Sequence, residues 1–167
     1  VKLIRLKTFC DERGFFSEIY RKLLYEENGI AVDFVQDNIS CSMKGTIRGM
    51  HFQSSPGQAK LITVIVGTIY DVFVDIRKGS PTFGQWGARE LDAIANEQLF
   101  IPVGFAHGFA VLSDIAHVMY KVSSVFDSET EKTFRHDDPQ VGIEWPFENP
   151  ILSERDLNAP LLKEALA

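Results

Sequence analysis

A run of β-branched and aromatic residues near the middle of the chain constrains the fold most strongly. LITVIV at 61–66 is followed by Gly67-Thr68 and then by IYDVFVDI at 69–76. Two such runs predict two consecutive strands joined by a tight turn. Side chains alternate between the two faces of the second run. One face carries Ile69, Asp71, Phe73 and Asp75, and the other carries Tyr70, Val72, Val74 and Ile76.

Strand-like segments also dominate the rest of the chain. GQWGARELDA (84–93), NEQLFIP (96–102), VGFAHGFAVLS (103–113) and IAHVMYKVSSVF (115–126) follow the loop RKGSPTFG at 77–84. Turn residues interrupt them about every 8 to 12 positions, as in a sandwich or jelly roll. Helical pattern is confined to the ends, at 21–29, where Gly29 closes the segment, and at 154–167. The sequence predicts one all-β domain over residues 1–167 with short flanking helices.

Composition excludes several classes of partner. The 167 residues suffice for one well-buried core, and the net charge of −6 gives no basic field for nucleic acid or an anionic membrane. Two cysteines, Cys10 and Cys41, are too few for a disulfide framework and are expected to be free thiols. The longest apolar stretch, 61–67, is too short to span a bilayer, and no signal peptide is visible. We therefore expect a cytoplasmic protein.

His51, in RGMHFQ at 48–53, is open to three interpretations: metal ligand, catalytic base or core residue. A jelly-roll metal site usually has a His-x-His pair with a carboxylate, and Gln53 stands where the second histidine is needed. The remaining histidines are His107, His117 and His136. This pattern disfavours a metal.

Other polar residues are ambiguous when each is taken alone. Lys60, at the start of an apolar strand, is typical of a solvated edge charge, although it lies close enough to His51 in sequence to face the same cavity. Tyr120 points inward if Lys121 faces water. The polar residues of DERGFFSE (11–18) and QDNIS (36–40) are individually typical of a surface. Together with Arg48 they suit a phosphorylated, hydroxyl-rich ligand.

A series of motifs in order resembles one known family. The motifs are DERGFFSE, FVQDNIS, RGMHFQ, QAKLITV, VDIRKGSPTFGQW, IPVGFAHGFAVLS, MYK, GIEWP and LSERD. From about Phe9 to Leu162 the chain is similar to the dTDP-4-dehydrorhamnose 3,5-epimerases (dTDP-4-keto-6-deoxyglucose 3,5-epimerases). The resemblance implies a cupin-type double-stranded β-helix, or jelly roll. It also implies a homodimer in which an N-terminal strand region crosses to the partner and contributes to its nucleotide site.

The resemblance also implies roles for individual residues. It makes His51 the base, Tyr120 the acid, Asp156 the carboxylate that pairs with the base and Lys60 the group that stabilises the enolate. It implies nucleotide-sugar contacts for Arg13, Glu18, Gln36, Asp37, Asn38, Arg48, Lys60, His107 and Glu131. Three residues depart from the family pattern: Phe126 replaces a tyrosine that packs on the ligand, Arg155 a lysine that contacts phosphate, and His136 a common tryptophan.

The implied reaction fits these residue types. Protons at C3 and C5 of a 4-keto sugar are both α to the carbonyl, so a base on one face and a donor on the other can invert each carbon through an enolate. No metal or other cofactor is required. The expected substrate is dTDP-4-keto-6-deoxy-D-glucose, which becomes dTDP-4-keto-L-rhamnose on the route to dTDP-L-rhamnose and cell-surface glycans such as lipopolysaccharide.

Three alternatives stay open at this point. The chain could invert one carbon only, C3 or C5, on another nucleotide-linked 4-keto sugar. It could be a metal-dependent cupin such as a dioxygenase, which Gln53 disfavours. It could be a non-catalytic sugar-nucleotide binding module, against which the joint presence of His51, Tyr120, Lys60 and Asp156 argues.

Overall fold

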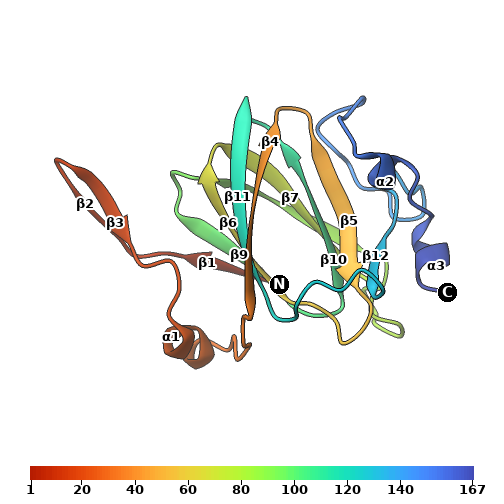
Figure 1. Ribbon diagram of the computed structural model, residues 1–167, viewed down its shortest axis with the longest axis horizontal. Coiled ribbons are helices and arrows are strands. Elements are labelled where there is room, and N and C mark those ends of the chain that lie inside the picture. Colours follow the sequence, from red (N-terminus) through yellow and green to blue (C-terminus); the bar gives the residue numbers. More distant parts are fainter.

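Two five-stranded antiparallel sheets face each other across the core in the computed structural model, which describes residues 1–167 (Figure 1). The first sheet has the order β1-β9-β6-β11-β4. Its strands are β1 (Lys2–Arg5), β9 (Glu97–Ile101), β6 (Lys60–Val66), β11 (Ile115–Val122) and β4 (Gln36–Met43).

The second sheet has the order β12-β5-β10-β7-β8. Its strands are β12 (Glu131–Thr133), β5 (Ile47–Gln53), β10 (Phe105–Val111), β7 (Thr68–Asp75) and β8 (Trp86–Asp92). The chain crosses between the sheets repeatedly, and β6 and β7, although consecutive, belong to different ones. The predicted all-β jelly roll is therefore confirmed, but the tight turn at Gly67 leads from one sheet to the other and does not form a paired hairpin.

Alternating side chains divide the strands between two apolar layers. Ile62 and Val64 from the first sheet and Ile69 and Phe109 from the second pack together between the sheets. On the opposite face of β7, Val72 and Val74 join a second cluster, covered by the C-terminal segment. The alternation predicted for residues 69–76 is thus correct, and it places Asp71 on the interior face of the barrel.

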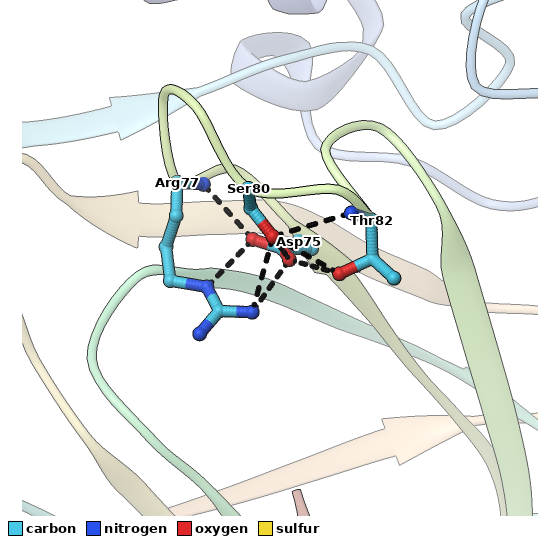
Figure 2. Close-up of polar contacts among 4 residues, drawn as sticks. All are labelled: Asp75, Arg77, Ser80 and Thr82. Carbon is cyan, nitrogen blue, oxygen red and sulfur yellow. Dashed lines mark hydrogen bonds and ion pairs between the residues drawn. The ribbon is translucent and has the colours of Figure 1, made fainter.

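The loop after β7 is held by one buried carboxylate (Figure 2). Asp75 Oδ1 accepts hydrogen bonds from Arg77 Nε at 2.9 Å and Arg77 N at 3.0 Å. Its Oδ2 accepts from Arg77 Nη2 at 2.7 Å and from the hydroxyls of Ser80 and Thr82, each at 2.6 Å. These donors, Arg77 foremost, hold the pKa of Asp75 well below its ordinary value. The carboxylate therefore fixes the predicted loop at 77–84 to the end of β7.

An N-terminal arm extends from the first sheet (Figure 1). Strands β2 (Thr8–Asp11) and β3 (Gly14–Ser17) form a hairpin that projects away from both sheets. The aromatic rings of Phe9, Phe15 and Phe16 on it are exposed. The helix α1 (Lys22–Glu27) follows and packs Tyr25 against the outer face of the first sheet. The hairpin buries little apolar surface within its own chain.

The C-terminal segment closes one side of the second sheet. It contains α2 (Glu154–Leu157) and α3 (Leu162–Ala165), so the short helices predicted at both ends of the chain are present. The hydroxyl of Ser153 caps α2 by accepting a hydrogen bond from Asp156 N at 3.1 Å. Cys10 and Cys41 are both free and exposed, as expected. None of the short helices has the length and apolar character that a membrane span requires.

Candidate active site

A cavity of about 280 Å³ opens between the two sheets. Strands β4, β5, β6, β10, β11 and β12 each contribute a polar side chain, and α2 adds one more. The lining residues are Gln36, Asn38, Ser40, Arg48, His51, Lys60, His107, Phe109, Tyr120, Phe126, Glu131 and Arg155. Ten of the residues predicted from the sequence to form the site therefore meet at one place.

A bulge in β5 brings Arg48 and His51 to the same cavity. His51 lies opposite His107 on β10, and Arg48 lies opposite Phe109. Between these two pairs, β5 therefore contains one more residue than β10. Residues three apart on a regular strand face opposite sides, but the extra residue in the bulge lets both side chains face the same side. Gly49 and Gly108 permit the close approach, since a Cβ on Gly49 would lie 2.5 Å from the Cα of Gly108.

His51 is bonded to a buried carboxylate from α2. Its Nε2 lies 2.6 Å from Asp156 Oδ1. Burial opposes ionisation of Asp156, but hydrogen bonds from His51, the Ser153 cap and the Gly49 backbone hold its pKa below the ordinary value. The carboxylate is therefore ionised near neutral pH and fixes a proton on His51 Nε2, which leaves Nδ1 as the free acceptor of the ring.

Lys60 is buried, so of the two interpretations open for it the solvated edge charge is excluded. Only 8% of it is exposed, because β6 turns it toward the barrel interior together with Ile62 and Val64. Burial lowers the pKa of Lys60 to about 8, against the opposing charges of Glu131 and Asp71. The ammonium makes no hydrogen bond within the chain and faces the cavity.

Tyr120 points into the same cavity from β11, while Lys121 points out of it. Lys121 Nζ lies 2.9 Å from both carboxylate oxygens of Asp37 on the outer face. Burial raises the pKa of Tyr120, Arg48 opposes that rise and Glu131 adds to it, so its hydroxyl keeps its proton at neutral pH. Tyr120 belongs to the first sheet and His51 to the second, so the two face the cavity from opposite walls.

Strand alternation separates the residues predicted on β4. Gln36 and Asn38 line the cavity, whereas the side chain of Asp37 lies on the other face with Lys121. Gln36 also accepts a hydrogen bond from Phe126 N at 3.0 Å and so holds the loop that carries Phe126. The side chain of Asp37 therefore does not line this cavity.

Arg13 and Glu18 lie far from this cavity on the N-terminal arm. Arg13 is paired with Asp11 at the hairpin tip, and Glu18 with Arg21 at 2.8 Å. Neither lines the cavity of its own chain.

The sequence did not single out Asp71, Ser40 or Phe109. Asp71 is fully buried, and its Oδ2 lies 2.8 Å from His107 Nε2. The signal available in the sequence was an acidic residue between Ile69 and Phe73 on one face of the strand at 69–76. At the mouth of the cavity Glu131 forms an ion pair with Arg155, beside the half-exposed ring of Phe126.

The donor set of the cavity does not resemble a metal centre. Each of its histidines already bonds a carboxylate, His51 to Asp156 and His107 to Asp71. No group of three or more His, Cys, Asp or Glu side chains is placed to hold a metal ion.

Known proteins agree with this geometry. The family model for dTDP-4-dehydrorhamnose 3,5-epimerase matches residues 1–164. The dTDP-4-dehydrorhamnose 3,5-epimerase of Shigella flexneri is 47% identical over 167 residues, covering 99% of this chain and 92% of that protein. The dTDP-4-dehydrorhamnose 3-epimerase of Streptomyces niveus is 40% identical, covering 93% of this chain and 76% of that one.

A solved structure shows the same architecture. The dTDP-6-deoxy-D-glucose-3,5-epimerase of Legionella pneumophila, crystallised in complex with dTDP-4-keto-L-rhamnose, superposes with a TM-score of 0.93. It is 48% identical, and the match covers 96% of this chain and 87% of that one. From the sequence match, the jelly-roll fold and the cavity between its sheets, we conclude that the chain belongs to the dTDP-4-dehydrorhamnose 3,5-epimerase family.

Proposed function

We propose that this cavity inverts C3 and C5 of dTDP-4-keto-6-deoxy-D-glucose to give dTDP-4-keto-L-rhamnose. One observation carries the proposal: the His51–Asp156 pair and the protonated Tyr120 face one cavity from opposite walls. Inversion needs this arrangement, because a proton returned to the face it left restores the substrate.

In this proposal His51 is the base. Asp156 holds its Nε2 proton, so Nδ1 is free to remove the proton from C3 or C5. The carboxylate also stabilises the imidazolium that forms. Tyr120 then delivers a proton to the opposite face of the ring.

Lys60 stabilises the enolate oxygen. Its ammonium is buried, has no hydrogen-bond acceptor in the chain and faces the cavity. A positive charge placed in advance in a water-poor site lowers the energy of a developing oxyanion more than the same charge would in water. No metal or cofactor takes part in this scheme.

The nucleotide end of the substrate lies, in our proposal, toward the mouth of the cavity. Arg48 and Arg155 supply positive charge for the diphosphate, and Phe126 supplies a ring for the base to pack on. Gln36, Asn38, His107 and Glu131 are left for hydroxyl and carbonyl groups of the ligand.

We further propose that the active form is a homodimer. The hairpin exposes Phe9, Phe15 and Phe16, and a cavity of about 660 Å³ lies between it, β1 and α1. A second copy covering this arm would bury those rings and bring Arg13 and Glu18 to its own cavity. Asp37, on the outer face of β4, would then act at the subunit contact or through its backbone.

Mixed dimers test whether the N-terminal arm of one chain contributes to the cavity of the other. Arg13→Ala and His51→Ala chains, each inactive alone, are co-expressed with different tags. If Arg13 serves the partner, half of the dimers are mixed with one intact site of two, which restores about one quarter of wild-type activity. If Arg13 serves its own chain, no site is intact and no activity returns.

A cytoplasmic location is also proposed. Both cysteines are free and exposed, which fits a reducing compartment.

Product stereochemistry tests the main proposal. The protein is incubated with dTDP-4-keto-6-deoxy-D-glucose, and the product is reduced and examined by NMR. Inversion at both carbons supports it. Inversion at C3 alone, the activity named for the Streptomyces niveus relative, supports the single-carbon alternative, and unchanged sugar contradicts both.

A further inference from the structure

The buried carboxylate of Asp71 has no part in the scheme above. It lies at the middle of β7 on the interior face, between the apolar Ile69 and Phe73, and is 0% exposed. Its Oδ2 contacts His107 Nε2 at 2.8 Å, whereas Oδ1 is enclosed and has no hydrogen-bond partner. A buried carboxylate with only one of its two oxygens hydrogen-bonded is unfavourable, so neighbouring groups must compensate its charge.

Two neighbours compensate the charge. Burial raises the pKa of Asp71, and His107 and Lys60 oppose the rise. Burial lowers the pKa of His107, so its ring is neutral near neutral pH. A neutral ring that meets a carboxylate at Nε2 carries its proton there. Its Nδ1 then carries the lone pair; this atom has no partner in the chain and is not enclosed.

The arrangement repeats that of His51. The two histidines are direct partners on adjacent strands, and each bonds its own carboxylate through Nε2. They differ in access: the side chain of His51 is 27% exposed and that of His107 only 7%. The open ring suits proton transfer, and the recessed ring suits a fixed contact.

We propose that Asp71 is a positioning residue of this site. It holds His107 in the tautomer that presents an unprotonated Nδ1 to a hydroxyl of the bound sugar, and with Glu131 it keeps the Lys60 ammonium charged. The identity of the ligand as a sugar rests on the proposed function; the tautomer and the charge of Lys60 do not.

The effect on Lys60 follows from the charges around it. Six titratable or charged groups line the cavity that Lys60 faces, and Asp71 lies behind His107; they come from five strands and one helix: Asp71, His107, Arg48, His51, Tyr120, Glu131 and Arg155. Glu131 and Asp71 raise the pKa of Lys60 against the effect of burial. Glu131 is already paired with Arg155, so Asp71 is the anion at Lys60 that no other cation neutralises.

The first test needs no substitution at Asp71. In ¹⁵N-labelled protein without ligand, ring-nitrogen shifts separate protonated from unprotonated nitrogens, and a His107→Gln spectrum assigns the signals. We expect His107 to carry its proton on Nε2, with Nδ1 unprotonated, between pH 6 and 8. A proton on Nδ1 in the wild-type protein overturns the proposal.

The second test compares two buried aspartates on one face of β7. Asp71→Asn keeps the size but lets an amide N–H face Nε2, which favours the other tautomer. We expect kcat/KM to fall about 10- to 100-fold, as for other partners of functional histidines. We also expect its alkaline limb to move to lower pH by roughly half a unit.

Asp75→Asn is the matched control. Asp75 is also buried and on the same face, but its partners are Arg77, Ser80 and Thr82 in the loop of Figure 2. This variant is expected to lower the unfolding temperature without moving the alkaline limb or the His107 tautomer. An unmoved limb and tautomer in Asp71→Asn, or an equal shift in both variants, contradicts the proposal.

The two tests also distinguish a failure of the positioning role of Asp71 from a failure of the proposed epimerase function. If Asp71→Asn does not fold, the wild-type spectrum still decides. If the protein fails to convert any dTDP-4-keto sugar but His107 has the expected tautomer, the proposed function is wrong and the positioning role stands.

Discussion

His51 and Asp156 lie 105 positions apart in the chain, yet His51 Nε2 is 2.6 Å from Asp156 Oδ1. The bulge of β5 turns the histidine into the cavity, and the Ser153 cap fixes the first turn of α2, from which the carboxylate projects. The pair therefore depends on the bulge in β5 and on the cap of α2. Its contribution to catalysis can be measured.

Asp156→Asn is expected to lower kcat by about 10² to 10⁴-fold, because the amide no longer holds the productive tautomer of His51. Steady-state kinetics measure the loss. Glu154→Gln on the exposed side of the same helix is the control and should keep wild-type kcat. A loss below about twofold in Asp156→Asn would mean that the base acts without its carboxylate.

Tyr120→Phe should separate proton removal from inversion. His51 can still remove a proton, so we expect some exchange of the C3 hydrogen with solvent, while productive inversion falls strongly. Solvent exchange and product formation are followed by NMR in one sample. Tyr70→Phe, which alters a tyrosine packed against Trp145 on the other face of β7, should leave both unchanged. Full inversion by Tyr120→Phe would exclude this donor.

The pH profile should report Lys60. Its pKa is lowered to about 8, so the ammonium is charged below that pH and loses its proton above it. We expect kcat/KM, which reports groups of the free enzyme, to fall as pH rises through about 8. Stopped measurements from pH 6 to 10 test this. A profile flat to pH 10 would mean that the charge on Lys60 is not required.

Lys60→Met should make the protein more stable and nearly inactive. In the unfolded chain a lysine titrates near its ordinary pKa, so below pH 8 the fold bears the full cost of a buried charge, and this cost shrinks as pH rises from about 8 to about 10.4. Removing the charge should raise the free energy of unfolding at pH 7 by about 1–3 kcal/mol. Activity should fall about 10²- to 10³-fold.

Urea denaturation at pH 7 measures the gain, with Lys44→Met on the exposed turn before β5 as the control that should show none. If Lys60→Met were less stable than the wild type, burial of the Lys60 charge would not destabilise the fold as predicted.

The fold was largely predictable because strand alternation is a local property. In residues 69–76 it correctly divided the two faces, and Gly29 marked the end of α1. The pairing of strands across two sheets is not local, so the tight turn predicted at Gly67 did not reveal that β6 and β7 lie in different sheets.

The site was predictable as a set of residues but not as a geometry. A bulge has no reliable sequence signature beyond Gly49 and Gly108, and it alone lets Arg48 and His51 share the cavity. Burial of Lys60 depends on which face of β6 is enclosed, and a lysine is rarely placed there. The same local reasoning placed Asp71 on one face with Ile69, Phe73 and Asp75, but it could not identify His107 as the partner of Asp71.

Deuterium incorporation tests the central claim most directly. The wild-type protein and His51→Ala are incubated with dTDP-4-keto-6-deoxy-D-glucose in D₂O, and the product is analysed by mass spectrometry and NMR. Our account predicts two deuterium atoms, at C3 and C5, for the wild type and none for His51→Ala. Deuterium at both carbons in His51→Ala at the wild-type rate would show that another residue is the base, and none in the wild type would contradict enolate chemistry in this cavity.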